Sequence, residues 1–103
     1  MHNDLPYRRL ALAPDLHLTW SAHLLTVASS RWSPGIFVYD LEYLSVEVNP
    51  SRKGGVKIVL GCRGAQILFQ VLRFDLDDVQ FELFRSFVAD MVAYREQMRA
   101  QEA

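Results

Sequence analysis

The hydrophobic and polar positions of this chain follow two different periods. From Arg8 to Arg73 the apolar residues form short runs, often alternating with polar residues, and Gly, Pro, Ser and Asn separate these runs. After Asp75 the apolar residues recur at steps of three and four. Alternation is typical of half-buried strands, and steps of three and four are typical of an amphipathic helix. The pattern therefore predicts a β-rich body followed by one C-terminal helix.

The β-rich part is predicted to contain six or seven short strands. Their ranges are 8–12, 16–20, 23–28, 36–39, 41–48, 56–60 and 65–72. The count is open because Ser21-Ala22 suits either a tight turn or a bend within one long strand. Pro34-Gly35 suits the centre of a type II turn. Short connections between the last three runs predict an antiparallel meander.

The predicted helix carries a wide apolar face that is rich in aromatic residues. Asp75 and Asp77 are both candidates for its N-cap, and Asp77 with Gln80 has the spacing of a capping box. No Gly or Pro follows Gly64, so the helix is expected to continue into a polar tail, residues 95–103, and to fray there. The face that should cover the sheet comprises Phe84, Phe87, Val88, Met91, Tyr94, Arg95 and Met98.

This order of elements resembles the pleckstrin-homology-like superfold. The resemblance is carried by the run 66–72, which leads through Asp75 into the helix at Phe84, Phe87 and Val88. It covers roughly Arg8 to Met98 and concerns element order, without a motif match. It implies an α+β fold in which a bent sandwich or partly open barrel is closed by one C-terminal helix, and it implies a scaffold for docking proteins or peptides.

One departure from that superfold bears on lipids. Its lipid-binding members use basic residues between the first two strands, whereas the corresponding Ala13-Pro14-Asp15 has neither Lys nor Arg. Phosphoinositide binding is therefore disfavoured, and a fold does not by itself define a function.

Composition narrows the setting in which the protein is expected to act. A chain of 103 residues suits one domain, 1–103, with flexible ends at 1–7 and 99–103. Its net charge of −1 gives no general attraction to nucleic acid or to an anionic membrane surface. No apolar run approaches the roughly 20 residues of a membrane-spanning helix. The N-terminus lacks the pattern of a signal peptide and Cys62 is the sole cysteine, so we expect a cytoplasmic protein.

The sequence contains few candidates for catalytic or metal-binding residues. His17 and His23 would share a face of one continuous strand but lie about 20 Å apart along it, while across a hairpin they could approach each other. A nucleophilic Cys62 would need a neighbouring base and a lowered pKa. A small enzyme based on these residues is thus the second alternative, and the prediction names no catalytic residue, metal site or cofactor.

The loop Arg52-Lys53-Gly54-Gly55 is the candidate anion site. Its two cations and free backbone N–H groups could contact a phosphate or a lipid headgroup, which makes such a ligand the first alternative function. It lacks the spacing of a nucleotide-binding loop, and a flexible hairpin tip explains the same residues.

Aromatic residues provide the candidate interaction surface, Trp32, Phe37, Tyr39 and Tyr43. Aromatic anchors are enriched at binding hot spots, and open strand edges recruit peptides or a second copy of the chain. A closed barrel, or a bulge at Asp40, would instead use these residues for packing. The sequence thus predicts a non-catalytic binding or adaptor domain with a protein or peptide partner, able to form a homodimer.

Overall fold

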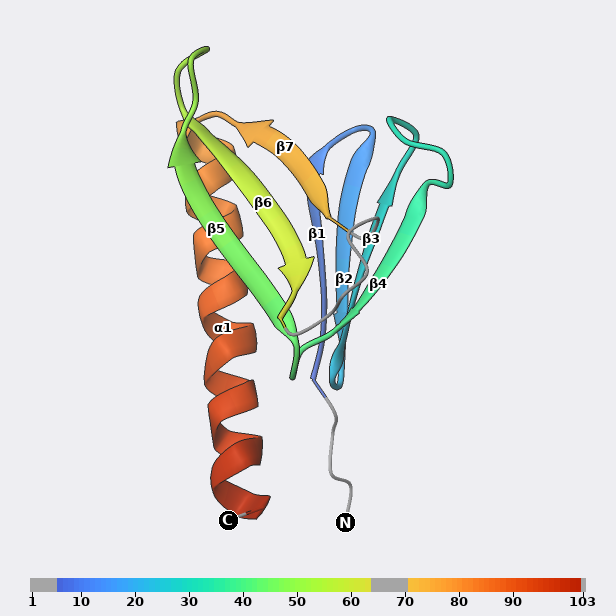
Figure 1. Cartoon of the computed structure of the whole chain (residues 1–103), viewed down its shortest axis with the longest axis vertical. Coiled ribbons are helices and arrows are strands. Elements are labelled where there is room, and N and C mark those ends of the chain that lie inside the picture. Colours follow the sequence, from blue (N-terminus) through green and yellow to red (C-terminus); the bar gives the residue numbers. More distant parts are fainter. Residues whose placement is uncertain (1–5, 64–70, 103) are drawn as a thin grey trace.

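Within the residues that the structure describes, seven antiparallel strands and one C-terminal helix make up the fold (Figure 1). The computed structural model describes residues 6–63 and 71–102. β1 to β4 form one sheet in that order, and β5 to β7 form a second. The predicted α+β sandwich is confirmed, with two separate sheets that do not close into a barrel. The elements are β1 (Tyr7–Ala13), β2 (Leu16–Ser21), β3 (Leu24–Ser29), β4 (Ile36–Asp40), β5 (Leu44–Pro50), β6 (Val56–Cys62), β7 (Leu72–Leu76) and α1 (Asp78–Glu102).

The alternation in the strands produces the inner faces of the two sheets. In β2 every second residue is buried, and Ile58 and Leu60 of β6 are fully enclosed. Helix α1 runs along one side of the sandwich, and its last turns extend past the strands (Figure 1). Its buried residues are Phe84, Phe87 and Met91. The helix thus covers the apolar side of the sandwich, as the period of its sequence predicts.

Aromatic contacts and one cation join α1 to the sheets. Trp20 contacts Phe87 edge-on with ring centroids 6.4 Å apart, and Phe74 contacts Phe84 at 6.1 Å. Arg8 of β1 forms an ion pair with Asp90 and lies over the Phe87 ring at 5.3 Å. These contacts hold the helix mainly against β1 and β7.

The helix begins with the predicted capping box. The N–H of Gln80 donates to the Asp77 carboxylate at 2.7 Å, and the N–H of Asp77 donates to the Gln80 side-chain oxygen at 2.9 Å. Asp75, the other N-cap candidate, lies within β7 instead, because Leu72–Leu76 continues the sheet. The predicted strand 65–72 largely falls on 64–70, outside the described residues.

Three other local predictions are settled. Ala22 and His23 form a tight turn, with Ala22 at a φ of 53°, so β2 and β3 are separate strands. The predicted strand 41–48 begins only at Leu44, because residues 41–43 turn the corner between the sheets. Gly35 lacks the positive φ of a type II turn, so that prediction is wrong; a Cβ there would instead lie 2.4 Å from the Ser29 carbonyl oxygen.

The tail for which the sequence predicts fraying is helical as far as Glu102. Arg95 and Arg99 explain this, because both reach back to the corner between the sheets. Arg95 donates to the Leu41 carbonyl oxygen, and Arg99 donates to both the carbonyl and the carboxylate of Glu42. Within the described ranges, no helix is both long enough and apolar enough to span a membrane.

Candidate functional site

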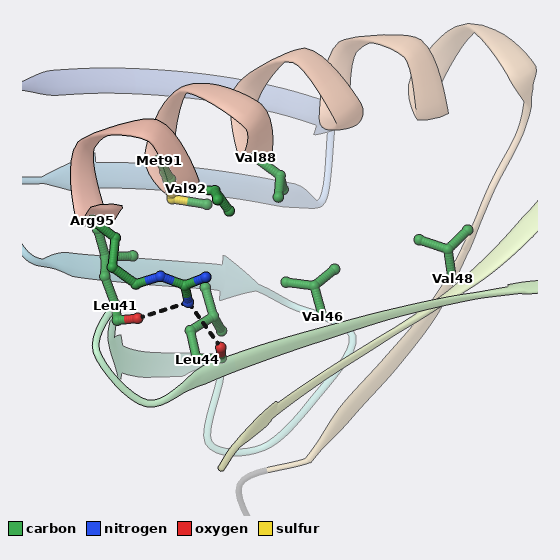
Figure 2. Close-up of a pocket in the computed structure, with 8 residues that line it drawn as sticks. All are labelled: Leu41, Leu44, Val46, Val48, Val88, Met91, Val92 and Arg95. Atoms are coloured by element: carbon green, nitrogen blue, oxygen red, sulfur yellow. Dashed lines mark hydrogen bonds between the residues drawn. The ribbon is translucent and has the colours of Figure 1, made fainter. Parts of the chain in front are cut away.

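An apolar cavity of about 330 Å³ lies between α1 and β5 (Figure 2). Its volume is at the lower end of the range for ligand pockets. Figure 2 shows Val46 and Val48 pointing from β5 toward the helix. We call this cavity the α1–β5 groove. It is lined by Leu41, Leu44, Val46, Val48, Val88, Met91, Val92 and Arg95.

The groove exists because α1 packs on β1 and β7 and stands further from β5. The side chains that β5 directs inward are therefore progressively uncovered along the strand. The exposed fraction rises from 6% at Leu44 to 46% at Val48. The groove is thus closed at the Leu44 end and open at the Val48 end.

Within the described ranges, β5 is a terminal strand of its sheet, and one of its two edges is open. Among the described residues, only β6 pairs with β5. The N–H of Arg63 donates to the Tyr43 carbonyl oxygen at 2.6 Å, and backbone groups alternate in direction along a strand. Residues 45 and 47 therefore face β6, while the N–H and C=O groups of Val46 and Val48 face the open edge.

Arg95 closes one end of the groove. Its Nη1 donates to the carbonyl oxygens of Leu41 and Leu44, at 3.2 and 3.4 Å (Figure 2). This side chain is 17% exposed, and its buried Nε lacks a hydrogen-bond partner in the described part of the chain. Glu96 lies 3.5 Å from Nε, which counts as an ion pair but is too long for a good hydrogen bond.

The four aromatic residues of the predicted interaction surface lie in different environments. Trp32 is half-buried and contacts the rings of Phe37 and Phe74, at 6.1 and 6.4 Å. Tyr39 is 1% exposed and therefore belongs to the core instead of the surface. Burial, with a smaller contribution from Cys62, raises the pKa of Tyr39 to about 12. Of the four, only Tyr43 is well exposed, at 56%.

An ion pair fixes the loop that carries Trp32. Arg31 donates to both carboxylate oxygens of Asp15, at 2.8 and 3.0 Å, and this contact lowers the pKa of Asp15. The loop between β3 and β4 is thereby joined to the turn between β1 and β2. Trp32 is held against the core side of this loop, which explains why a tryptophan in a polar segment is half-buried.

The exposed apolar residues of β4 alternate with Phe37 and Tyr39, so they lie on the other face of the strand. Ile36 and Val38 of β4 are 64% and 50% exposed, while Phe37 and Tyr39 point inward. β4 ends its sheet within the ranges that the structure describes. The sequence shows the alternation, but it does not show which of the two faces is the outer one.

The candidate anion loop lies beside acidic residues. A shallow depression next to Lys53 and Gly54 is also lined by Asp75, Asp77 and Asp78. The N–H groups of Lys53 and Gly54, predicted to be free, donate to the side chain and carbonyl of Ser51. These features weaken the case for an anion there, although binding itself stays a prediction.

The structure does not bring His17, His23 and Cys62 together. His17 lies near the start of β2, His23 lies in the turn that follows β2, and Cys62 pairs with Leu44 at the end of β6. His17 Nε2 is 3.1 Å from the Pro14 carbonyl oxygen. The described residues contain no group of three or more His, Cys, Asp or Glu side chains suited to a metal ion.

Sequence reasoning missed the α1–β5 groove. The sequence places Val46 and Val48 in the predicted strand 41–48, and Val88 and Arg95 on the covering face of the helix. The available signal is the wide apolar face of the helix, but its spacing does not show which strands that face contacts. The sequence matches no protein-family model, no curated protein and no solved structure.

Proposed function

We propose that this protein is a non-catalytic peptide-binding domain that takes an extended segment of a partner protein into the α1–β5 groove. The segment adds to the open edge of β5 as a further strand. Its side chains on one face enter the apolar space between β5 and α1.

The observation that carries this proposal is the coincidence of an open strand edge with an apolar cavity. The backbone groups of Val46 and Val48 offer hydrogen bonds to a new strand, and the adjoining groove accepts its side chains. Main-chain hydrogen bonds of this kind supply affinity, while pockets for alternate side chains supply specificity. The resemblance to the pleckstrin-homology-like superfold, a docking scaffold, supports the same function.

Affinity selection tests the proposal. The probe is a pool of short random peptides, synthesised once with free carboxyl termini and once with carboxamide termini. We expect peptides with alternating apolar residues to be retained. In Val92→Gln, whose side chain lines the groove, loss of roughly 1.5 kcal/mol of apolar contact should weaken the selected peptides about tenfold.

Val79→Gln is the matched control. Val79 is a valine on the same helix, 73% exposed and outside the groove, so its substitution should leave peptide affinity unchanged. Circular dichroism checks that both variants keep the fold. Retention of no peptide in either pool, or equal weakening by the two substitutions, would contradict the proposal.

Self-association through β4 is a second candidate, favoured by the exposure of Ile36 and Val38 on a terminal strand. A second copy could pair with this edge and cover both side chains. Light scattering should then give a concentration-dependent mass that Val38→Lys returns to that of the monomer. A monomeric mass for the unmodified protein at all concentrations would rule this candidate out.

The setting that we propose remains the cytoplasm. Cys62 is the sole cysteine, so the chain has no internal disulfide to form, which suits a reducing compartment. Microscopy of the tagged full chain would test this location.

A further inference from the structure

Arg95 makes the two ends of the α1–β5 groove chemically different, because it places a positive charge at one of them. Of the described residues that line the cavity, it alone is charged, and it lies at the Leu44 end. Its two hydrogen bonds to the described residues both come from Nη1. A guanidinium has five N–H donors, so the two on Nη2 are left for an acceptor, whereas the Nε donor is buried.

Neighbouring groups neutralise this charge only in part. Leu41 and Leu44 contribute carbonyl dipoles, and the nearest carboxylate, Glu96, is 56% exposed. Glu96 is also shared, because its Oε1 lies 3.2 Å from Nη1 of Arg99. A ligand carboxylate in the sheltered groove would therefore complement Arg95 more directly than Glu96 does.

Strand direction decides which part of a ligand reaches Arg95. Antiparallel pairing is the more stable arrangement, and a strand antiparallel to β5 runs from the Val48 end toward the Leu44 end. Its carboxyl-terminal side therefore arrives at Arg95. The Arg95 side chain bridges α1 and the corner between the sheets, so it lies across this end of the groove, where a terminal carboxylate would meet it.

We infer that the groove binds the free C-terminus of a partner protein, with its terminal carboxylate on the Arg95 guanidinium. The inference rests on the proposed function and adds the chemistry of the ligand. The preceding apolar residues lie along β5, with their side chains between Val46 and Val92. The backbone groups at the β5 edge favour a peptide over a fatty acid, which could not pair with them.

The two peptide pools provide the test. For the same sequence, the peptide with a free carboxylate should bind roughly tenfold more tightly than the carboxamide, as expected for a charge-assisted hydrogen bond in a sheltered site. In Arg95→Gln, which keeps an N–H donor and removes the charge, the ratio should fall to about one. Isothermal titration calorimetry measures all four affinities.

Arg99→Gln is the matched control, because Arg99 contacts the same corner through Glu42 but does not line the cavity. It should keep the preference for the free carboxylate. If Arg95→Gln does not fold, the comparison of acid and amide on the unmodified protein still decides the question.

The outcomes separate the two proposals. Equal binding of the peptide acid and the peptide amide would overturn the role of Arg95 and leave peptide binding intact. Selection of amide peptides with an internal Asp or Glu would have the same meaning. Failure to retain any peptide would overturn both. Binding of dodecanoate as tightly as the best peptide acid would assign the groove to a fatty acid instead.

Discussion

The side chain of Tyr39 links the core to alkaline stability. Burial raises its pKa from 10.0 in a model compound to about 12 in the folded protein. Between pH 10 and 12 the unfolded chain loses a proton that the folded protein keeps. The free energy of unfolding that the burial of neutral Tyr39 contributes below pH 10 is therefore lost as the pH rises through this window, by an amount on the order of 3 kcal/mol.

Tyr39→Phe should remove this dependence. Denaturant unfolding at neutral pH and near pH 11 should show a smaller loss of unfolding free energy in the variant than in the unmodified protein. An equal loss in both proteins would show that Tyr39 is not the group that titrates.

Two adjacent glycines of the β5–β6 hairpin should respond differently to alanine. Gly54 and Gly55 have φ angles of 87° and 70°, so either substitution should cost about 1 kcal/mol or more. Only at Gly55 would the new Cβ also lie 2.2 Å from the Leu76 carbonyl oxygen, whereas nothing lies within 4 Å at Gly54. Denaturant unfolding should therefore show a distinctly larger loss of stability for Gly55→Ala, and equal losses would contradict this close approach.

At the scale of elements, the start of α1 depends on Asp77. Asp77→Ala removes the acceptor of the Gln80 N–H and should cost about 1 kcal/mol in unfolding free energy. Asp75→Ala is the control, because Asp75 lies in β7 and its carboxylate accepts an exposed hydrogen bond from Ser51 instead of capping the helix. A larger loss for the Asp75 variant than for the Asp77 variant would contradict the observed helix start.

The sequence predicted the elements better than it predicted their surroundings. The two periods and the spacing of Asp77 and Gln80 are local, so most of the strands, the helix and its cap could be predicted, whereas β7 (Leu72–Leu76) lies almost wholly beyond the predicted strand 65–72. Whether Phe37 or Val38 points inward depends on how the sheets pack, and alternation alone does not say. The groove likewise depends on how far α1 stands from β5, which long-range contacts such as Trp20 with Phe87 determine.

At the scale of the whole molecule, one helix serves two purposes. The face centred on Phe84 and Phe87 closes the core against β1 and β7, while Val88, Val92 and Arg95 form a wall that β5 does not reach. Arg95 and Arg99 fix the far end of the helix to the corner between the sheets. The same packing that stabilises the sandwich therefore leaves a groove with one open and one closed end.

Residue-specific amide hydrogen exchange tests peptide binding at β5 most directly. In the free protein the amides of Val46 and Val48 should exchange quickly, because they face the open edge of the sheet. Addition of a selected peptide should slow both more than tenfold and change Ser45 and Glu47, which face β6, much less. Slowing confined to β4 or to the 52–55 loop, with Val46 and Val48 unchanged, would contradict the account.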